Sequence, residues 1–172
     1  MPSIERVSAA EFGPCVKELA DLLADAVEGG ASVGFVTPFG HEDAAAWWRA
    51  QAPAVAAGDL LVWACREDGA MVGTVSLLLA GKPNSRHRAE LVKLLVRRSA
   101  RGRGLSRALL ATAERAAAEA GIELLMLDTE TGSTAEHVYL TGGWTRYGVV
   151  PAYAGAPDGT LLDCSFFYKR LS

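Results

Sequence analysis

Cysteine is scarce in this chain of 172 residues. The three cysteines, Cys15, Cys65 and Cys164, are an odd number at wide spacings. Such spacings fit neither a disulfide framework nor the Cys-x-x-Cys pairs of a zinc site. We therefore expect three small buried side chains in a reducing, cytoplasmic compartment.

Long hydrophobic runs are also missing. The longest uncharged apolar stretch in the middle of the chain, residues 70–81, is far shorter than the about 20 residues that a membrane-spanning helix needs. The first residues lack the basic start and apolar run of a secretory signal. These absences predict a protein without a membrane partner.

Repeats, low-complexity segments and a composition typical of disorder are absent as well. A chain of this length, 50% hydrophobic by composition, can bury roughly two thirds of its unfolded surface in one core. We expect a single domain over residues 1–172. Because His41, His87 and His137 share no metal-ligand spacing, no metal site is predicted.

The formal net charge of −3 hides an uneven distribution. Residues 82–107 contain nine basic side chains and one acidic side chain, so this segment carries +8 and the remainder −11. A basic segment of this kind attracts an anionic ligand, although a solvated basic face is the alternative. The acidic remainder and the lack of interleaved aromatic residues argue against nucleic-acid binding.

The first half of the chain predicts two helical regions and a hairpin. Ser8-x-x-Glu11 has the form of a capping box, and apolar residues follow at helical spacing until Gly29-Gly30. A second helix is expected over residues 41–57, interrupted by Pro53. Two β-rich runs, residues 59–66 and 71–80, flank the turn signal Asp68-Gly69 and predict adjacent antiparallel strands.

The second half predicts a strand, a helix and a strand that pairs in parallel with the first. These elements are residues 89–96, a helix from Leu105 to Gly121, and residues 122–128. Ser133-x-x-Glu136 then has the form of a second capping box for a short helix. Two closing strands are expected over residues 144–150 and 161–170. The pattern predicts an α/β domain with a mixed sheet.

The loop between the strand and the helix is the most informative segment. Residues 95–106 read Leu-Val-Arg-Arg-Ser-Ala-Arg-Gly-Arg-Gly-Leu-Ser. Free backbone amides at a helix start form an anion site, and Gly102 and Gly104 let the backbone approach the anion closely. An ordinary glycine turn is the alternative. Neither a P-loop nor a dinucleotide fingerprint matches the segment.

Arg101-x-x-Gly104-x-Ser106 resembles the Arg/Gln-x-x-Gly-x-Gly/Ala loop of the acetyl-CoA-dependent GCN5-related N-acetyltransferase (GNAT) family. Residues 132–144 are similar to a second family pattern, with Tyr139 and Gly143-Trp144 in register. The run 127–133 and Pro151-x-Tyr153 look like the tabtoxin-resistance branch. Ser106 and Gly132 depart from the usual Gly/Ala and Asn at their positions.

The resemblance, which covers residues 59–170, implies a GNAT-like fold, α/β or α+β by some schemes. Its sheet is mixed and mostly antiparallel, with six or seven strands and helices on both faces. It also implies acetyl-CoA as cosubstrate. The diphosphate would lie on Arg101, Gly102, Arg103, Gly104, Leu105 and Ser106, and the pantetheine arm along Leu94, Leu95 and Val96. A bulge in this strand would let a backbone amide meet the thioester oxygen.

For proton transfer, the resemblance makes Tyr139 the candidate acid at the departing thiolate, with a core aromatic as the alternative. Asp128 and Glu130 are candidates to accept the amine proton, directly or through water, because alternation places both on one strand face. A solvated strand end is their alternative. Glu136 is interpreted as the capping partner of Ser133.

The resulting hypothesis is an N-acetyltransferase that moves an acetyl group directly to a primary amine of a small molecule in a ternary complex. An antibiotic, a toxin or an amino-acid-like compound would fit the branch. The alternatives are a protein lysine or N-terminal acetyltransferase and an inactive CoA-binding sensor. The sequence leaves the oligomeric state open, a homodimer included. At most one of Trp47 and Trp48 can face the core.

Overall fold

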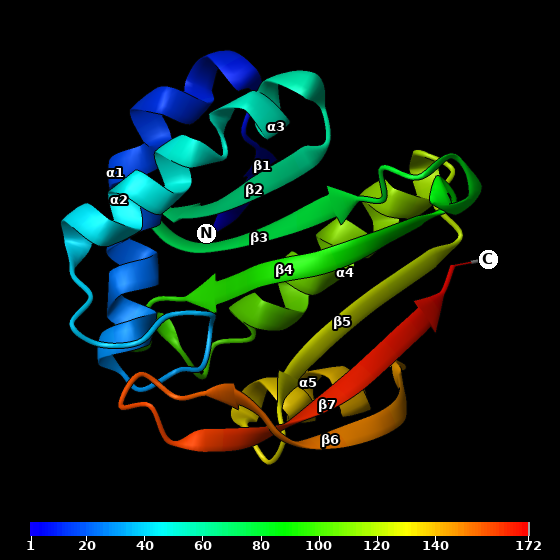
Figure 1. Cartoon of the computed structure of the whole chain (residues 1–172). Coiled ribbons are helices and arrows are strands. Elements are labelled where there is room, and N and C mark those ends of the chain that lie inside the picture. Colours follow the sequence, from blue (N-terminus) through cyan, green and yellow to red (C-terminus); the bar gives the residue numbers. More distant parts are fainter. Residues whose placement is uncertain (172) are drawn as a thin grey trace.

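The computed structural model describes residues 1–171 and contains one seven-stranded sheet with helices on both of its faces (Figure 1). The elements of the first half are β1 (Ser3–Arg6), α1 (Ala9–Glu28), α2 (His41–Ala50), α3 (Ala52–Ala57), β2 (Leu60–Glu67) and β3 (Ala70–Leu79). Those of the second half are β4 (Arg88–Val96), α4 (Leu105–Glu119), β5 (Leu124–Glu130), α5 (Thr134–Thr141), β6 (Thr145–Gly155) and β7 (Leu161–Arg170). Short 3₁₀ turns lie at Pro83–Ser85 and Arg98–Ala100.

Local signals in the first half are confirmed. The Ser8 hydroxyl accepts a hydrogen bond from the Glu11 amide at 3.3 Å, and the Glu11 carboxylate accepts one from the Ser8 amide at 3.0 Å. A cap of this kind stabilises a helix by about 1 kcal/mol. The expected second helix is divided at Gln51 into α2 and α3, with Pro53 in the first turn of α3. The strand β1 was not predicted.

The sheet has the strand order β1-β2-β3-β4-β5-β7-β6. Every neighbouring pair is antiparallel except β4 and β5, which run parallel and are joined through α4. The expected mixed, mostly antiparallel sheet with helices on both faces is therefore confirmed.

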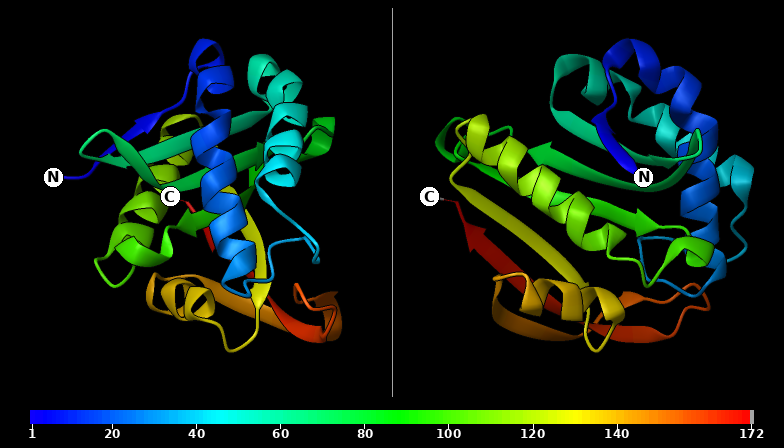
Figure 2. Two further views of the ribbon diagram at one scale, coloured as in Figure 1. Left: turned by 90° about the vertical axis from the view of Figure 1, so that its left-hand side faces the viewer. Right: turned by 180° about the vertical axis from the view of Figure 1, so that it is seen from behind.

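Two hydrophobic clusters fill the space between the sheet and the helices. One lies under α4 and α5 and includes Leu109, Leu125 and Phe167. The other lies under α1, α2 and α3 and includes Leu19 and Trp48. Figure 2 shows α4 and α1 on opposite faces of the sheet. Because α1 and α3 pack against β2, β3 and β4, the β5–β7 part of that face extends beyond these helices.

The strands β4 and β5 separate after a short paired stretch. They pair only at residues 88–90 of β4 and 124–126 of β5, and Glu90 and Met126 form the last pair. Beyond that point β5 continues beside β7 and β4 continues beside β3. The edge of β4 that faces the gap therefore has no strand partner within the described chain, which leaves the backbone groups of residues 91–95 that point into the gap for a ligand.

A bulge in β4 lies beside this gap. Thr74 of β3 pairs with Leu95, whereas Ser76 pairs with Val92, so β4 holds one residue more than β3 over the same span. Lys93 adopts a φ of 53° at this point. The bulge expected from the family resemblance is present.

Candidate active site

The loop before α4 presents a row of unengaged backbone amides. Within residues 1–171, no acceptor is found for the amides of residues 102–107. Gly102 and Gly104 have φ values of 76° and 77°, which L side chains rarely adopt, and Gly104 is the N-cap of α4. An ideal Cβ on either glycine would have no heavy atom within 4 Å, so the loop faces open space. This arrangement can bind a phosphate group at the positive end of the helix dipole.

Arginines brace the loop. The Arg101 guanidinium donates from Nε to the Val96 carbonyl at 3.2 Å, so it ties the loop to the end of β4. Arg103 forms an ion pair with Glu67 of β2. These two arginines of the basic segment therefore bind groups within the protein.

A third arginine links the loop to α1. The Arg98 amide donates to the Asp25 carboxylate at 2.8 Å, and its guanidinium donates to Asp25 and Glu28 at 2.9 and 3.0 Å. These contacts hold the start of the loop against the C-terminal end of α1.

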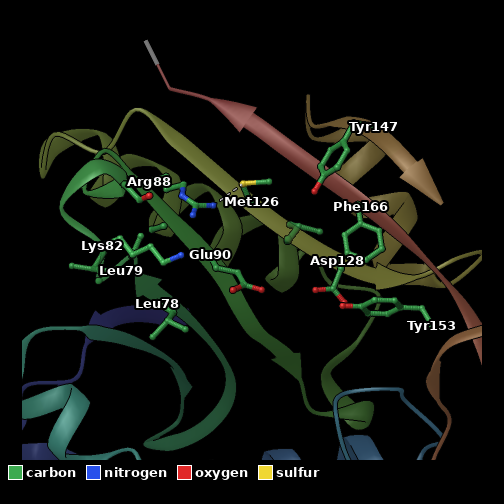
Figure 3. A pocket seen from close by; sticks show the side chains of 15 residues that line it. Leu78, Leu79, Lys82, Arg88, Glu90, Met126, Asp128, Tyr147, Tyr153 and Phe166 are labelled. Atoms are coloured by element: carbon green, nitrogen blue, oxygen red, sulfur yellow. Dashed lines mark hydrogen bonds between the residues drawn. The ribbon is translucent and has the colours of Figure 1, made fainter. Parts of the chain in front are cut away.

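A pocket of about 460 Å³ lies on the sheet face that α1 only partly covers, next to the point where β4 and β5 separate. Ligand pockets commonly have volumes in this range. Figure 3 shows Glu90 and Asp128 pointing into it, with Lys82 and Arg88 toward one end and Tyr153 beside Asp128 at the other. Further side chains in its wall include Leu78, Leu79, Met126, Tyr147 and Phe166.

The two carboxylates of the pocket are partly removed from water. Burial raises the pKa of Glu90, and the neighbouring Asp128 raises it further, against the opposing effect of Lys93 and Arg88. Burial also raises the pKa of Asp128, and Lys93 opposes that change. An acidic pair with raised pKa values can bind a cationic amine and accept its proton.

Tyr139 lies on α5 on the other side of β5. Its ring is 5% exposed and packs edge-on against Trp144 and at an angle against Phe167, with centroid distances of 5.8 and 5.9 Å. Burial and the charge of Asp128 raise the pKa of its hydroxyl. The side chain is therefore a core aromatic and also keeps its proton at neutral pH, so both interpretations of Tyr139 remain compatible with its position.

The structure separates the other acidic candidates. Glu130 shares the sheet face of Asp128 but is not among the residues that line the pocket. The Ser133 hydroxyl caps α5 by accepting from the Glu136 amide at 3.2 Å. The Glu136 carboxylate does not complete the expected box, because it accepts at 3.4 Å from the amide of Gly132, which precedes the cap in the chain.

Several residues of the site were not found by sequence reasoning. The sequence pattern marks Glu90 and Lys93 only as charges in the basic segment, and Tyr147 and Phe166 only as members of strands. Glu90 pairs with Met126 in the parallel register of β4 and β5, and this register places Glu90 near Asp128. The sequence alone does not contain that register. Of the tryptophans, Trp48 is fully buried and Trp47 is half-buried against Phe35, which confirms that one of the two faces the core.

Comparison with known proteins establishes the family. A sequence model of the acetyltransferase (GNAT) family matches residues 19–142. This stretch is well over half of the chain and contains the loop before α4, β5 and Tyr139. The chain therefore belongs to the GNAT family of acetyltransferases. The class of enzyme expected from the sequence, an N-acetyltransferase that uses acetyl-CoA, is confirmed at the level of the family.

Solved structures share the whole fold. An N-acetyltransferase from Staphylococcus aureus Mu50 superposes with a TM-score of 0.81 at 17% identity, covering 100% of this chain and 99% of that one. A ribosomal-protein-alanine N-acetyltransferase from Brucella melitensis has a TM-score of 0.79 at 24% identity, with 98% and 99% covered. A phosphinothricin acetyltransferase from Sinorhizobium meliloti, solved in complex with AcCoA, has a TM-score of 0.81 at 16% identity, with 99% and 89% covered.

Two further features concern metals and membranes. No group of three or more metal-ligating side chains comes together among residues 1–171. Over the same residues, the helices are either too short or too polar to span a bilayer.

Proposed function

We propose that this protein transfers the acetyl group of acetyl-CoA directly to a primary amine of a small molecule bound in the pocket between β4 and β5. The observation that carries the proposal is the position of Asp128. Asp128 follows Met126, which forms the last β4–β5 pair with Glu90. An amine bound to the Asp128 carboxylate would therefore lie where the two strands begin to separate.

The residues on the other side of the gap fit the donor. The unengaged amides that follow Arg101 would hold a diphosphate. The edge of β4 at Leu94, Leu95 and Val96, apart from the Val96 carbonyl that accepts from Arg101, would pair with the amide groups of a pantetheine arm. Ser106 is small enough for this approach to the start of α4. Acetyl-CoA supplies a thioester carbonyl carbon that an uncharged amine can attack. A backbone amide of β4 near the bulge would stabilise negative charge on the thioester oxygen, a contribution of about 3 kcal/mol in other enzymes.

In the proposed reaction, protein side chains accept the proton of the amine and donate a proton to the leaving thiolate. An amine arrives as an ammonium ion, and the carboxylates of Asp128 and Glu90 bind it and accept its proton, directly or through water. Glu130, on the same strand face, is the third acidic group near this path. Tyr139 retains its proton and would donate it to the thiolate as the amide product forms.

The charges of the pocket support an acceptor with an anionic group as well as an amine. Lys82 and Arg88 line the end away from Asp128, and neither forms an ion pair with any residue in the described chain. The Arg88 guanidinium donates to the sulfur of Met126, at 3.7 Å. A carboxylate or similar group could bind there while the amine lies at the acidic end. An amino-acid-like compound has this charge arrangement.

The compartment and the assembly belong to the same proposal. All three cysteines are free and buried, which suits a reducing cytoplasm. A homodimer remains a prediction.

The experiment is thiol release from acetyl-CoA with matched acceptors: an amino acid, its carboxamide, and the same amino acid with its amine blocked. We expect turnover with the free amine and none with the blocked one. The carboxamide should lose at least roughly tenfold in kcat/KM, because Lys82 and Arg88 then face no anion.

Matched variants assign the acidic group. Asp128→Asn should lower kcat/KM roughly 100-fold with the preferred amine, whereas Glu130→Gln, outside the pocket lining, should have a much smaller effect. Turnover on peptides or proteins but on no free amine would replace the proposal with a protein acetyltransferase. CoA binding without turnover on any amine would replace it with a sensor.

A further inference from the structure

Lys93 has an unusual place in the fold. It lies in the bulge of β4, where its φ of 53° is a conformation that side chains other than glycine seldom adopt. Glycine would take this backbone geometry without strain. A lysine at this position therefore points to a contribution from its side chain.

The lysine ammonium connects the bulge to the segment between α1 and α2. It donates to the Val33 carbonyl at 3.2 Å and lies 4.8 Å from the centroid of the Trp47 ring and 5.7 Å from that of Phe35. Phe35 in turn stacks on Phe39 with a centroid distance of 4.5 Å. A cation among aromatic rings is attracted by their faces, so one side chain holds residues 33–39 and α2 against β4.

The same ammonium influences the acidic pair of the pocket. Burial lowers the pKa of Lys93, while Asp128 and, less strongly, Glu90 raise it. In return Lys93 lowers the pKa of both carboxyl groups against the effect of burial. The groups around Asp128 are Lys93 and Glu90 on β4, Glu130 on β5, Tyr139 on α5, Tyr153 on β6 and Cys164 on β7. Lys82 and Arg88 line the other end of the pocket, and Lys93 is the cation that lowers the pKa of Asp128.

We propose that Lys93 is a positioning residue for the acetyl transfer: its ammonium fastens the α1–α2 segment to the bulge of β4 and supplies a positive charge beside the acidic pair. The inference rests on the proposed function in that Asp128 is taken to receive the amine. It adds a residue that belongs neither to the loop before α4 nor to the residues that line the pocket.

The test compares Lys93→Met with Lys93→Arg. Methionine keeps an unbranched stem at the strained position but removes the charge, whereas arginine retains it. Without the cation, the Asp128 carboxyl stays protonated to higher pH. The acidic limb of the kcat/KM profile in Lys93→Met should therefore move upward by about one pH unit, and in Lys93→Arg it should stay near its wild-type position.

A second readout does not depend on turnover. The carbon-13 shift of the Asp128 carboxyl, assigned by its loss in Asp128→Asn, can be titrated in the protein without acetyl-CoA. We expect the titration midpoint to rise in Lys93→Met as the kinetic limb does. If the protein transfers no acetyl group at all, this titration still decides the role of Lys93 separately from the proposed function.

Lys93→Gln is a second neutral variant, and its amide can still donate to the Val33 carbonyl. It should show the same upward shift even if the methionine variant does not fold. A neutral variant that loses activity while its acidic limb and its carboxyl titration stay unchanged would reduce Lys93 to a structural contact and overturn the proposal. So would full activity with an unchanged pH profile.

Discussion

At the scale of single residues, the site depends on side chains whose environment changes their chemistry. Asp128 and Glu90 are carboxyl groups with raised pKa values because burial disfavours their charged forms. Tyr139 is a phenol that burial keeps protonated. In the proposed function they are the proton acceptors on one side of β5 and the proton donor on the other, as acyl transfer to an amine requires.

Tyr139 can be tested without disturbing the core. In Tyr139→Phe the ring contacts with Trp144 and Phe167 remain, and the hydroxyl has no hydrogen-bond partner within the described chain. We expect kcat to fall roughly 100-fold or more while the thermal unfolding curve stays close to that of the wild type. Thiol release across the pH range measures the first quantity and calorimetry the second. Full activity at every pH would show that Tyr139 is only a core aromatic.

At the scale of elements, two interruptions of regular structure create the site. The β4 bulge and the early end of β4–β5 pairing expose one strand edge, and the left-handed glycines before α4 expose a row of amides. Both are places where backbone groups lack a protein partner, and such groups are costly to bury unless a ligand satisfies them. The proposed donor site is therefore built mainly from backbone groups.

Gly104 allows a test of the amide row. Gly104→Asp adds a negative charge at the N-cap of α4, and Gly104→Asn has nearly the same shape and backbone strain without the charge. We expect the KM for acetyl-CoA to rise roughly tenfold or more in the aspartate variant relative to the asparagine variant. Equal KM values in two folded variants would place the diphosphate elsewhere.

The same elements show what the sequence could predict. Local signals sufficed for the Ser8 cap, the helix break just before Pro53 and the Asp68-Gly69 hairpin, because each depends on residues close together in the chain. The short strand β1 carries too few residues for a clear pattern. The bulge at Lys93 depends on how β4 aligns with β3, and the partnership of Glu90 with Asp128 depends on where two strands separate. No local pattern contains that information.

At the scale of the whole molecule, the structure shows where the unevenly distributed charges of the sequence lie. The basic segment is not one solvated face: Arg98 and Arg103 are paired with acidic residues, Lys93 faces the acidic pair, and Lys82 and Arg88 line the pocket. In the proposed function, the loop before α4 holds the donor and the pocket beside Asp128 holds the acceptor, both next to one strand gap. In the proposed function this charge distribution brings an anionic cosubstrate and a cationic amine together.

The central claim is direct transfer between these two sites, and a single-turnover experiment tests it. Excess enzyme is mixed with isotopically labelled acetyl-CoA and an accepted amine, and the reaction is quenched over time. We predict that label appears on the amine at the rate of thiol release, with none on the protein, since Cys65 and Cys164 are buried with raised thiol pKa values. Label on the protein before it reaches the amine, or thiol release without an acetylated amine, would contradict the account.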